Sequence, residues 1–146
     1  QRLKKYFINQ YFMPNIQLKL AEHIKKFANT SIDVSDGLLA DLDKMINNQK
    51  LSYKLFLEDI PISNNLKKIL NLNNLSKINY VSNGDDYQVL FTASKNKRRI
   101  IKEISTNCKI KLTQIGSIQS IIKKSTIVDH KNREINLKNK GYFHQF

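Results

Sequence analysis

Glycine is the residue that most limits how this chain can turn, because it occupies only four of the 146 positions. Glycine adopts a positive φ without strain and lets another backbone approach closely. Three of the four stand in polar or aromatic clusters, at residues 33–38 (DVSDGL), 83–87 (NGDDY) and 141–144 (GYFH). Because so few glycines are available, these clusters are predicted to be turns with a functional role.

Helical and strand patterns alternate around those turns. Apolar residues recur at helical spacing over 16–28, 38–48, 64–70 and 95–106, with Ser63 and Ser94 as the expected N-caps of the last two. Alternating or β-branched runs predict strands at 31–34, 51–58, 87–92 and 110–112, a loop at 71–79, and a hairpin over 120–137 that turns at 129–132. This order predicts one α+β domain, with a mixed β-sheet packed against helices.

Length and composition exclude several classes of protein. A chain of this length with 40% hydrophobic residues can bury a core. Its longest apolar runs are a few residues, so no membrane-spanning segment is expected. The lone Cys108 excludes a disulfide framework and a multi-cysteine zinc site, which favours a reducing, cytoplasmic setting. The chain begins at Gln1 without a signal-peptide pattern, and we expect it to be a piece of a longer protein.

The net charge of +13 raises the possibility of nucleic-acid binding. Lys, Ile and Asn together fill 57 of the 146 positions, a bias that A/T-rich codons alone would produce. The basic residues are scattered, only four are Arg, and no run interleaves them with aromatics. A basic nucleic-acid-binding module is therefore the weaker alternative, although such a surface can attract a small anion.

The first cluster has the chemistry of a nucleotide site. It joins a predicted strand to a predicted helix, and the free N–H groups at a helix N-terminus can hold a phosphate. Asp33 and Asp36 are three residues apart across this junction and can converge on Mg²⁺, with Ser35 touching phosphate. The alternative is that Ser35 or Asp36 only caps the helix. That alternative leaves Asp33, an acid in an apolar strand, unexplained.

The other two clusters have both structural and functional interpretations. Asp85 and Asp86 precede an apolar strand, where they can bind a metal, bind a cationic ligand, or form an Asx-type turn. The aromatic tail at 141–146 can dock on the core or stack a ring on a flat ligand. His144 has no Cys or His neighbour in the sequence, which disfavours a metal role. His23 lies on a predicted helix face and His130 in a predicted turn, and we expect no role for either.

Taken together, the clusters resemble bacterial thiamine-monophosphate kinase. Residues 33–38 resemble its Asp-Ile/Val-Ser-Asp-Gly-Leu motif, 84–92 its Gly-Gly-Glu-Asp-Tyr-Glu-Leu-x-Phe-Thr segment, 115–118 its Ile-Gly-x-Ile and 141–144 its closing Gly-Tyr-x-His-Phe. The matches follow the family order from about Pro14 to the end of the chain. They correspond to the C-terminal half of the family enzyme.

The resemblance implies a fold like the C-terminal domain of aminoimidazole ribonucleotide synthetase. Residues 1–14 would connect it to a missing N-terminal domain, and 15–146 would form the C-terminal domain. The implied reaction transfers the γ-phosphoryl group of ATP to thiamine monophosphate, with Mg²⁺, in an enzyme that dimerises through its N-terminal domain. Carried over by position, the site residues would be Asp33 and Asp36 for Mg²⁺, Ser35 for ATP, and Asp85 and Tyr142 for the substrate.

The sequence departs from the family pattern around the substrate positions. Asn83 replaces a Gly, Asp85 is one methylene shorter than the family Glu, and Gln88 replaces a second Glu. An alternative is therefore a related ATP-binding or maturation protein of the same superfamily without thiamine chemistry. Because the resemblance covers only half of the enzyme, the chain alone is expected to be inactive.

Overall fold

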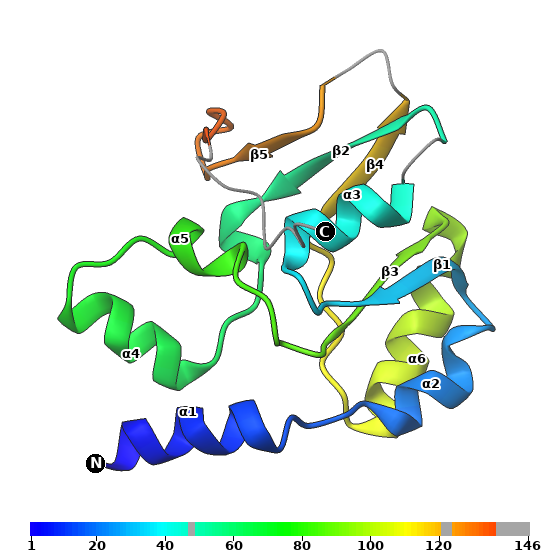
Figure 1. Ribbon diagram of the computed structural model, residues 1–146. Helices are drawn as coiled ribbons and strands as arrows, with labels where there is room; N and C mark the ends of the chain where they lie inside the picture. The colour runs from blue at the N-terminus through cyan, green and yellow to red at the C-terminus, as the bar shows by residue number, and fades with distance from the viewer. Residues whose placement is uncertain (47–48, 121–123, 137–146) are drawn as a thin grey trace, which may run out of the picture.

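Two small β-sheets at different levels of the molecule organise the fold (Figure 1). The computed structural model describes residues 1–46, 49–120 and 124–136. Its strands are β1 (Ala28–Asp33), β2 (Leu51–Phe56), β3 (Val89–Ala93), β4 (Gly116–Ser120) and β5 (Thr126–Val128). Its helices are α1 (Arg2–Phe12), α2 (Leu18–Ile24), α3 (Leu38–Ile46), α4 (Asn64–Leu72), α5 (Ile78–Val81) and α6 (Arg98–Cys108), with short 3-10 turns η1 (Leu57–Asp59) and η2 (Lys95–Lys97).

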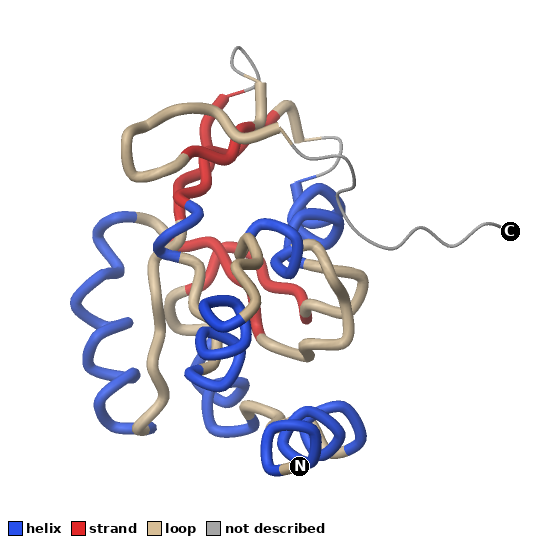
Figure 2. Tube along the Cα trace, turned by 90° about the vertical axis from the view of Figure 1, so that its left-hand side faces the viewer, coloured by secondary structure: helices blue, strands red, loops and turns tan. Residues whose placement is uncertain are grey.

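The sheets differ in size and in strand direction. β1 pairs with β3 in an antiparallel two-stranded sheet, in which Asp33 lies opposite Val89. The other sheet has the order β4-β2-β5, with β2 antiparallel to β4 and parallel to β5. A mixed sheet packed against helices is what the sequence predicted, so the α+β class is confirmed. The strands form two sheets, with α3 at a level between them (Figure 2).

The two faces of the β1–β3 sheet contact different cores, because successive side chains of a strand point to opposite faces, although Asn29, Ser31 and Asp33 of β1 stay exposed. On one face, Leu90 packs with α3, whose residues Leu39 and Leu42 share a core cluster with β2 and β5. On the other face, Phe91 packs with α2 and α6, in a second cluster formed around Leu20, Phe27 and Ile104. The sheet therefore joins the two cores, and the loop after β1 and the loop before β3 leave it at one end.

Most predicted elements are present, with shifted bounds. The predicted cap at Ser63 is confirmed, since its Oγ accepts a hydrogen bond from the N–H of Leu66. Ser94 stands at the start of η2, but its side chain makes no capping bond there. The hairpin prediction is supported at its turn, where Ile135 N–H donates to the carbonyl of Ile127 at 2.8 Å. Its remaining residues, 121–123 and 137, lie outside the described residues.

Two predictions were wrong. Residues 110–112 form no strand: Lys109 ends α6 in a left-handed conformation, and Ile110 then packs on the second core cluster without a strand partner. Part of the predicted loop at 71–79 is helical, because α4 continues to Leu72 and α5 begins at Ile78. The segment predicted as a connector, residues 1–14, is largely the helix α1, and its connecting role stays a prediction.

Helix α1 lies at the edge of the molecule in both views (Figures 1 and 2). It buries no residue, and it leaves Ile8, Tyr11 and Phe12 exposed at 44%, 61% and 73%. Over the residues that the structure describes, no helix is both long enough and apolar enough to cross a bilayer.

Candidate functional site

The first two glycine clusters lie side by side. Because β1 and β3 are antiparallel neighbours, the end of β1 meets the start of β3. Backbone hydrogen bonds continue this pairing beyond the strands, since the N–H groups of Tyr87 and Asp85 donate to the carbonyls of Val34 and Ser35 at 2.9 and 2.8 Å. The structure thus brings together two segments that are about fifty residues apart in the sequence. We call residues 33–37 the first loop and residues 83–87 the second loop.

The close contact between the loops requires glycine. A Cβ placed on Gly84 would lie 2.1 Å from the carbonyl oxygen of Ser35, where no atom fits. A Cβ on Gly37 would lie 2.4 Å from the carbonyl oxygen of Ser82, and Gly37 has a φ of +120°. Backbone therefore packs directly on backbone here, which explains why a glycine-poor chain keeps glycine at these two positions.

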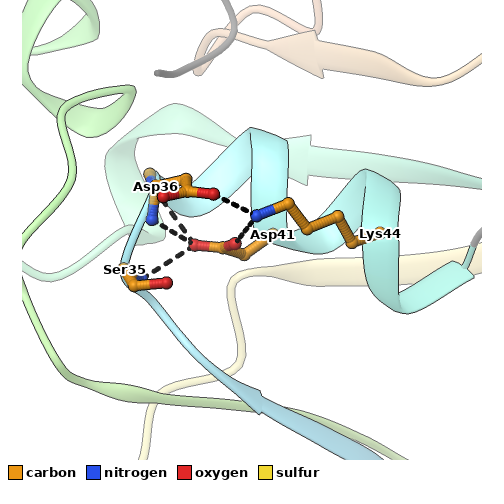
Figure 3. A network of polar contacts seen from close by, with 5 residues as sticks. Ser35, Asp36, Asp41 and Lys44 are labelled. Carbon is orange, nitrogen blue, oxygen red and sulfur yellow. Dashed lines mark hydrogen bonds and ion pairs between the residues drawn. The ribbon is translucent and has the colours of Figure 1, made fainter. Parts of the chain in front are cut away.

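A buried carboxylate from α3 holds the first loop (Figure 3). Asp41 is only 1% exposed, and its Oδ2 accepts hydrogen bonds from three consecutive backbone N–H groups. The three distances are 2.9 Å from Ser35, 2.9 Å from Asp36 and 3.2 Å from Gly37. One carboxylate oxygen thus satisfies the N–H groups where the chain enters α3.

Lys44 balances the charge of this carboxylate. Its Nζ lies 2.9 Å from Oδ1 of Asp41 and also contacts Oδ2 of Asp36. Burial disfavours ionisation of Asp41, but the hydrogen bonds from Lys44 and from the first loop outweigh it, so the pKa of Asp41 lies below its usual value. Hydrogen bonds to Asp36 and Asp41 raise the pKa of Lys44. Asp41 and Lys44 are therefore both charged at neutral pH.

The N–H groups of the first loop are not available to a phosphate, because those of Ser35, Asp36 and Gly37 already donate to Asp41. Phosphate binding by the N–H groups of the first turn of α3 stays a prediction. The carboxylate of Asp41 also removes the need for Ser35 or Asp36 to cap the helix alone. A contact from Ser35 to a nucleotide would have to use the Ser35 side chain.

Asp33 and Asp36 are placed differently from one another. Asp33 is exposed at the end of β1, so it lies in the outward position of an alternating strand rather than inside an apolar one. The Asp36 side chain is 19% exposed and pairs with Lys44. In residues 1–46, 49–120 and 124–136, no group of three His, Cys, Asp or Glu could hold a metal. Mg²⁺ is often held by one or two carboxylates plus phosphate oxygens, so a metal role for Asp33 and Asp36 stays a prediction.

The second loop has an unusual backbone. Asp85 and Tyr87 have φ values of 63° and 49°, in the left-handed region that such residues seldom adopt. The hydroxyl of Tyr87 donates to Oδ1 of Asp85 at 3.3 Å, and the charge of Asp85 raises the pKa of Tyr87. Partial desolvation raises the pKa of Asp86, although the residue is solvent-accessible, and the neighbouring charge of Asp85 adds to the effect. Asp85 is therefore already oriented by a hydrogen bond within its own loop.

Sequence reasoning did not identify the residues whose side chains hydrogen-bond to the loops of the predicted site. Asp41 interrupts the apolar run of residues 38–42. An acid on the buried face of a helix needs a hydrogen-bonding or charged partner, and this was the available signal. Nothing in the sequence pattern pointed to the hydrogen bond of Tyr87. Tyr142, the other predicted substrate residue, lies outside the described residues.

Comparison with known proteins gives one consistent result. The chain is 33% identical over 143 residues to the thiamine-monophosphate kinase of Buchnera aphidicola subsp. Acyrthosiphon pisum, covering 97% of this chain and 43% of that protein. It is 31% identical over 113 residues to that of Aquifex aeolicus, covering 77% and 34%. The chain therefore spans less than half the length of these relatives. No family model matches it.

Solved structures agree with the sequence relatives. A structure of AaThiL complexed with AMPPCP and TMP superimposes with a TM-score of 0.73 at 25% identity, covering 98% of this chain and 43% of that one. A crystal structure of thiamine monophosphate kinase from Aquifex aeolicus gives 0.70 at 26% identity, covering 92% and 42%. These solved structures thus share the arrangement of helices and strands described above along nearly the whole chain.

Proposed function

The chain belongs to the thiamine-monophosphate kinase family and corresponds to its C-terminal half, and we propose that it is the C-terminal part of an enzyme that transfers the γ-phosphoryl group of ATP to thiamine monophosphate. The observation that carries the proposal is the meeting of the two loops, which gathers Asp33, Ser35, Asp36 and Asp85 at one end of the β1–β3 sheet. A structural neighbour that is complexed with AMPPCP and TMP supports both substrates.

The first loop is the proposed nucleotide side of the site. Asp33 and Asp36 would hold Mg²⁺, which supplies neutralisation of the phosphate charge that develops during transfer. Asp36 is already oriented toward a cation, because its carboxylate contacts the ammonium group of Lys44. The hydroxyl of Ser35 is the proposed contact with ATP, since the Ser35 backbone N–H is engaged by Asp41.

The second loop is the proposed substrate side. Thiamine carries a positively charged thiazolium ring, and the carboxylate of Asp85 is suited to a cation. The hydroxyl of Tyr87 leaves the second oxygen of Asp85 available to the substrate. Tyr142 remains a proposed stacking partner for the thiamine rings.

The rest of the catalytic machinery is proposed to come from an N-terminal part of the same enzyme. The chain spans 43% of the Buchnera relative, so more than half of that protein has no counterpart here. We propose that α1 leads into this N-terminal domain, that residues 15–146 form the C-terminal domain, and that the complete enzyme is a homodimer. The chain on its own is expected to show no measurable phosphoryl transfer from ATP to thiamine monophosphate.

The metal role is tested by Asp33→Asn and Asp36→Asn in the complete enzyme. Each change removes a negative oxygen ligand while nearly preserving shape, so turnover should fall by at least about a hundredfold if the residues hold Mg²⁺. Thermal unfolding without ligand should change little for Asp33→Asn, because Asp33 is exposed. Near-wild-type turnover in either variant would remove that residue from the proposed site.

The substrate assignment needs a separate experiment. The complete enzyme is incubated with ATP, Mg²⁺ and thiamine monophosphate, and thiamine diphosphate is measured by chromatography. ATP hydrolysis that proceeds equally well without thiamine monophosphate, and yields no thiamine diphosphate, would favour a related ATP-binding protein without thiamine chemistry. Lys124→Met is a suitable control, because Lys124 is exposed and pairs only loosely with Glu134 at 3.7 Å.

A further inference from the structure

Asp41 is absent from the proposed set of ligands, yet it is the most buried charged side chain in the described part of the chain. We propose that Asp41 is a positioning residue. It fixes the first loop so that Asp33, Ser35 and Asp36 face their ligands at a set position relative to Asp85. The catalytic consequence of this inference rests on the proposed function. The structural part, that Asp41 holds the first loop in place, can be tested even if the proposed function is wrong.

Three hydrogen bonds to one oxygen restrict the first loop strongly. The N–H groups of Ser35, Asp36 and Gly37 must all point at Oδ2 of Asp41, which fixes the orientation of three successive peptide planes. Hydrogen bonds to an ionised acceptor are shorter and stronger than neutral ones. The directions in which the Ser35 and Asp36 side chains leave the backbone are therefore set from inside α3.

The same loop is held from its other side by the second loop. The carbonyl of Ser35 accepts the N–H of Asp85 at 2.8 Å, and Gly84 packs against that carbonyl. The residue Ser35 is thus bound through its N–H to Asp41 and through its carbonyl to Asp85. Any shift of the Asp41 carboxylate is transmitted to both loops, so one buried side chain sets the placement of Asp36 relative to Asp85.

Lys44 connects this support to the proposed metal site. Its ammonium group contacts Asp41 and Asp36 together, while half of its side chain remains exposed. The carboxylate of Asp41 therefore has a charged partner despite its burial, as a buried charge requires. The side chain of Asp36 is held at Oδ2 by the same cation, so the support from Asp41 also reaches this side chain.

The experiment compares Asp41→Asn with Asp43→Asn in the complete enzyme. Asn keeps the shape of Asp41 but loses the charge that attracts three N–H groups and Lys44. Asp43 lies two residues further along α3 and accepts a hydrogen bond from Tyr53 of β2. Both variants change an acid to an amide on one helix, so a general effect of lost charge appears in both.

The first measurement is backbone amide exchange of the peptide covering residues 33–38, followed by mass spectrometry. Asp41→Asn should speed exchange there at least tenfold, whereas Asp43→Asn should leave it near the wild-type rate. The second measurement is the affinity for Mn²⁺ as a probe for the proposed Mg²⁺ site, which should weaken at least tenfold in Asp41→Asn alone. Misplacement by about an ångström is enough to cost a hundredfold in turnover. We expect a fall in kcat of ten- to a hundredfold with a smaller change in KM.

Unchanged exchange at residues 33–38 in Asp41→Asn would overturn the inference, as would equal losses of Mn²⁺ affinity in the two variants. Should Asp41→Asn fail to fold, Asp41→Glu keeps the charge for Lys44 and lengthens the side chain by one methylene. Glu should then shift the first loop and lower kcat while the enzyme still folds, and a wild-type kcat would again overturn the inference. If the wild-type enzyme makes no thiamine diphosphate, the proposed function fails while exchange and Mn²⁺ affinity still decide the role of Asp41.

Discussion

Gly84 leaves no space for a larger side chain where the two loops cross. We predict that Gly84→Ala lowers stability by about 1–3 kcal/mol, the usual range for overpacking a filled site. The atom in the way is a backbone carbonyl oxygen of Ser35, which cannot rotate aside as a flexible side chain would. The bond from Asp85 to that carbonyl should be lost as well. Thermal unfolding checks the prediction.

The control for Gly84→Ala is Ser82→Ala in the neighbouring segment. Ser82 faces Gly37 through its backbone carbonyl, which the alanine variant retains. Ser82→Ala should therefore unfold near the wild-type temperature. Equal melting temperatures for Gly84→Ala and the wild type would show that the loops separate more easily than their contacts indicate.

For single residues, sequence patterns identified the candidate site residues but not the hydrogen bonds that fix their loops. Asp33, Ser35, Asp36 and Asp85 were singled out because their residue types suit ligands, and the structure brings their loops together. Which N–H groups were already engaged could not be predicted, since that depends on how far Asp41 reaches back from α3. The N–H groups of residues 35–37 are therefore unavailable to a phosphate, which the sequence alone did not indicate.

Among the elements, those with a strong periodic pattern were predicted best. Helix α3 and strand β2 lie within the predicted ranges because each buries one regular face on the same core. Apolar and polar residues alternate over 110–112 as they do in a strand. Such a pattern indicates which side chains are buried, but it does not indicate whether the backbone has a hydrogen-bonding partner. Ile110 and Leu112 obtain their burial by packing beside Ile104, so no strand forms.

The turn after β5 should make stability depend on pH. Asp129 accepts hydrogen bonds from the N–H groups of Lys131 and Arg133, and from the Arg133 guanidinium. These contacts, led by Arg133, hold the pKa of Asp129 below its ordinary value of 3.8. A lowered carboxyl pKa contributes stability above the unfolded value, and that contribution is lost as the pH falls through the folded value.

We therefore predict that Asp129→Asn lowers the melting temperature at pH 7. The difference from the wild type should shrink as the pH falls from 3.8 through the lower folded pKa, because the wild-type carboxylate becomes protonated over that interval. Melting curves of both proteins between about pH 7 and pH 2 test this. Glu134→Gln is the control, since its exposed pair with Lys124 should matter little. A difference that stays constant over the whole range would contradict the prediction.

For the whole molecule, the charge of +13 should give weak and salt-sensitive binding to nucleic acids. Scattered lysines neutralise phosphates without reading bases, so affinity should come from counterion release alone. We expect binding to duplex DNA to weaken steeply as salt rises from about 50 to 200 mM. Fluorescence anisotropy measures it. Submicromolar affinity that persists above physiological salt would contradict the prediction and revive the nucleic-acid alternative.

Helix α1 has a consequence for how the molecule loses its structure. It has 11 residues and buries none of them, whereas isolated helices shorter than roughly 12–15 residues are only marginally stable in water. Its order is therefore not coupled to the two cores, and it should melt as a separate, non-cooperative unit well before them. A calorimetric scan of this chain would then record less helix-melting heat in the main transition than its helical content suggests, and an N-terminal domain that covered Tyr11 and Phe12 would restore the missing cooperativity.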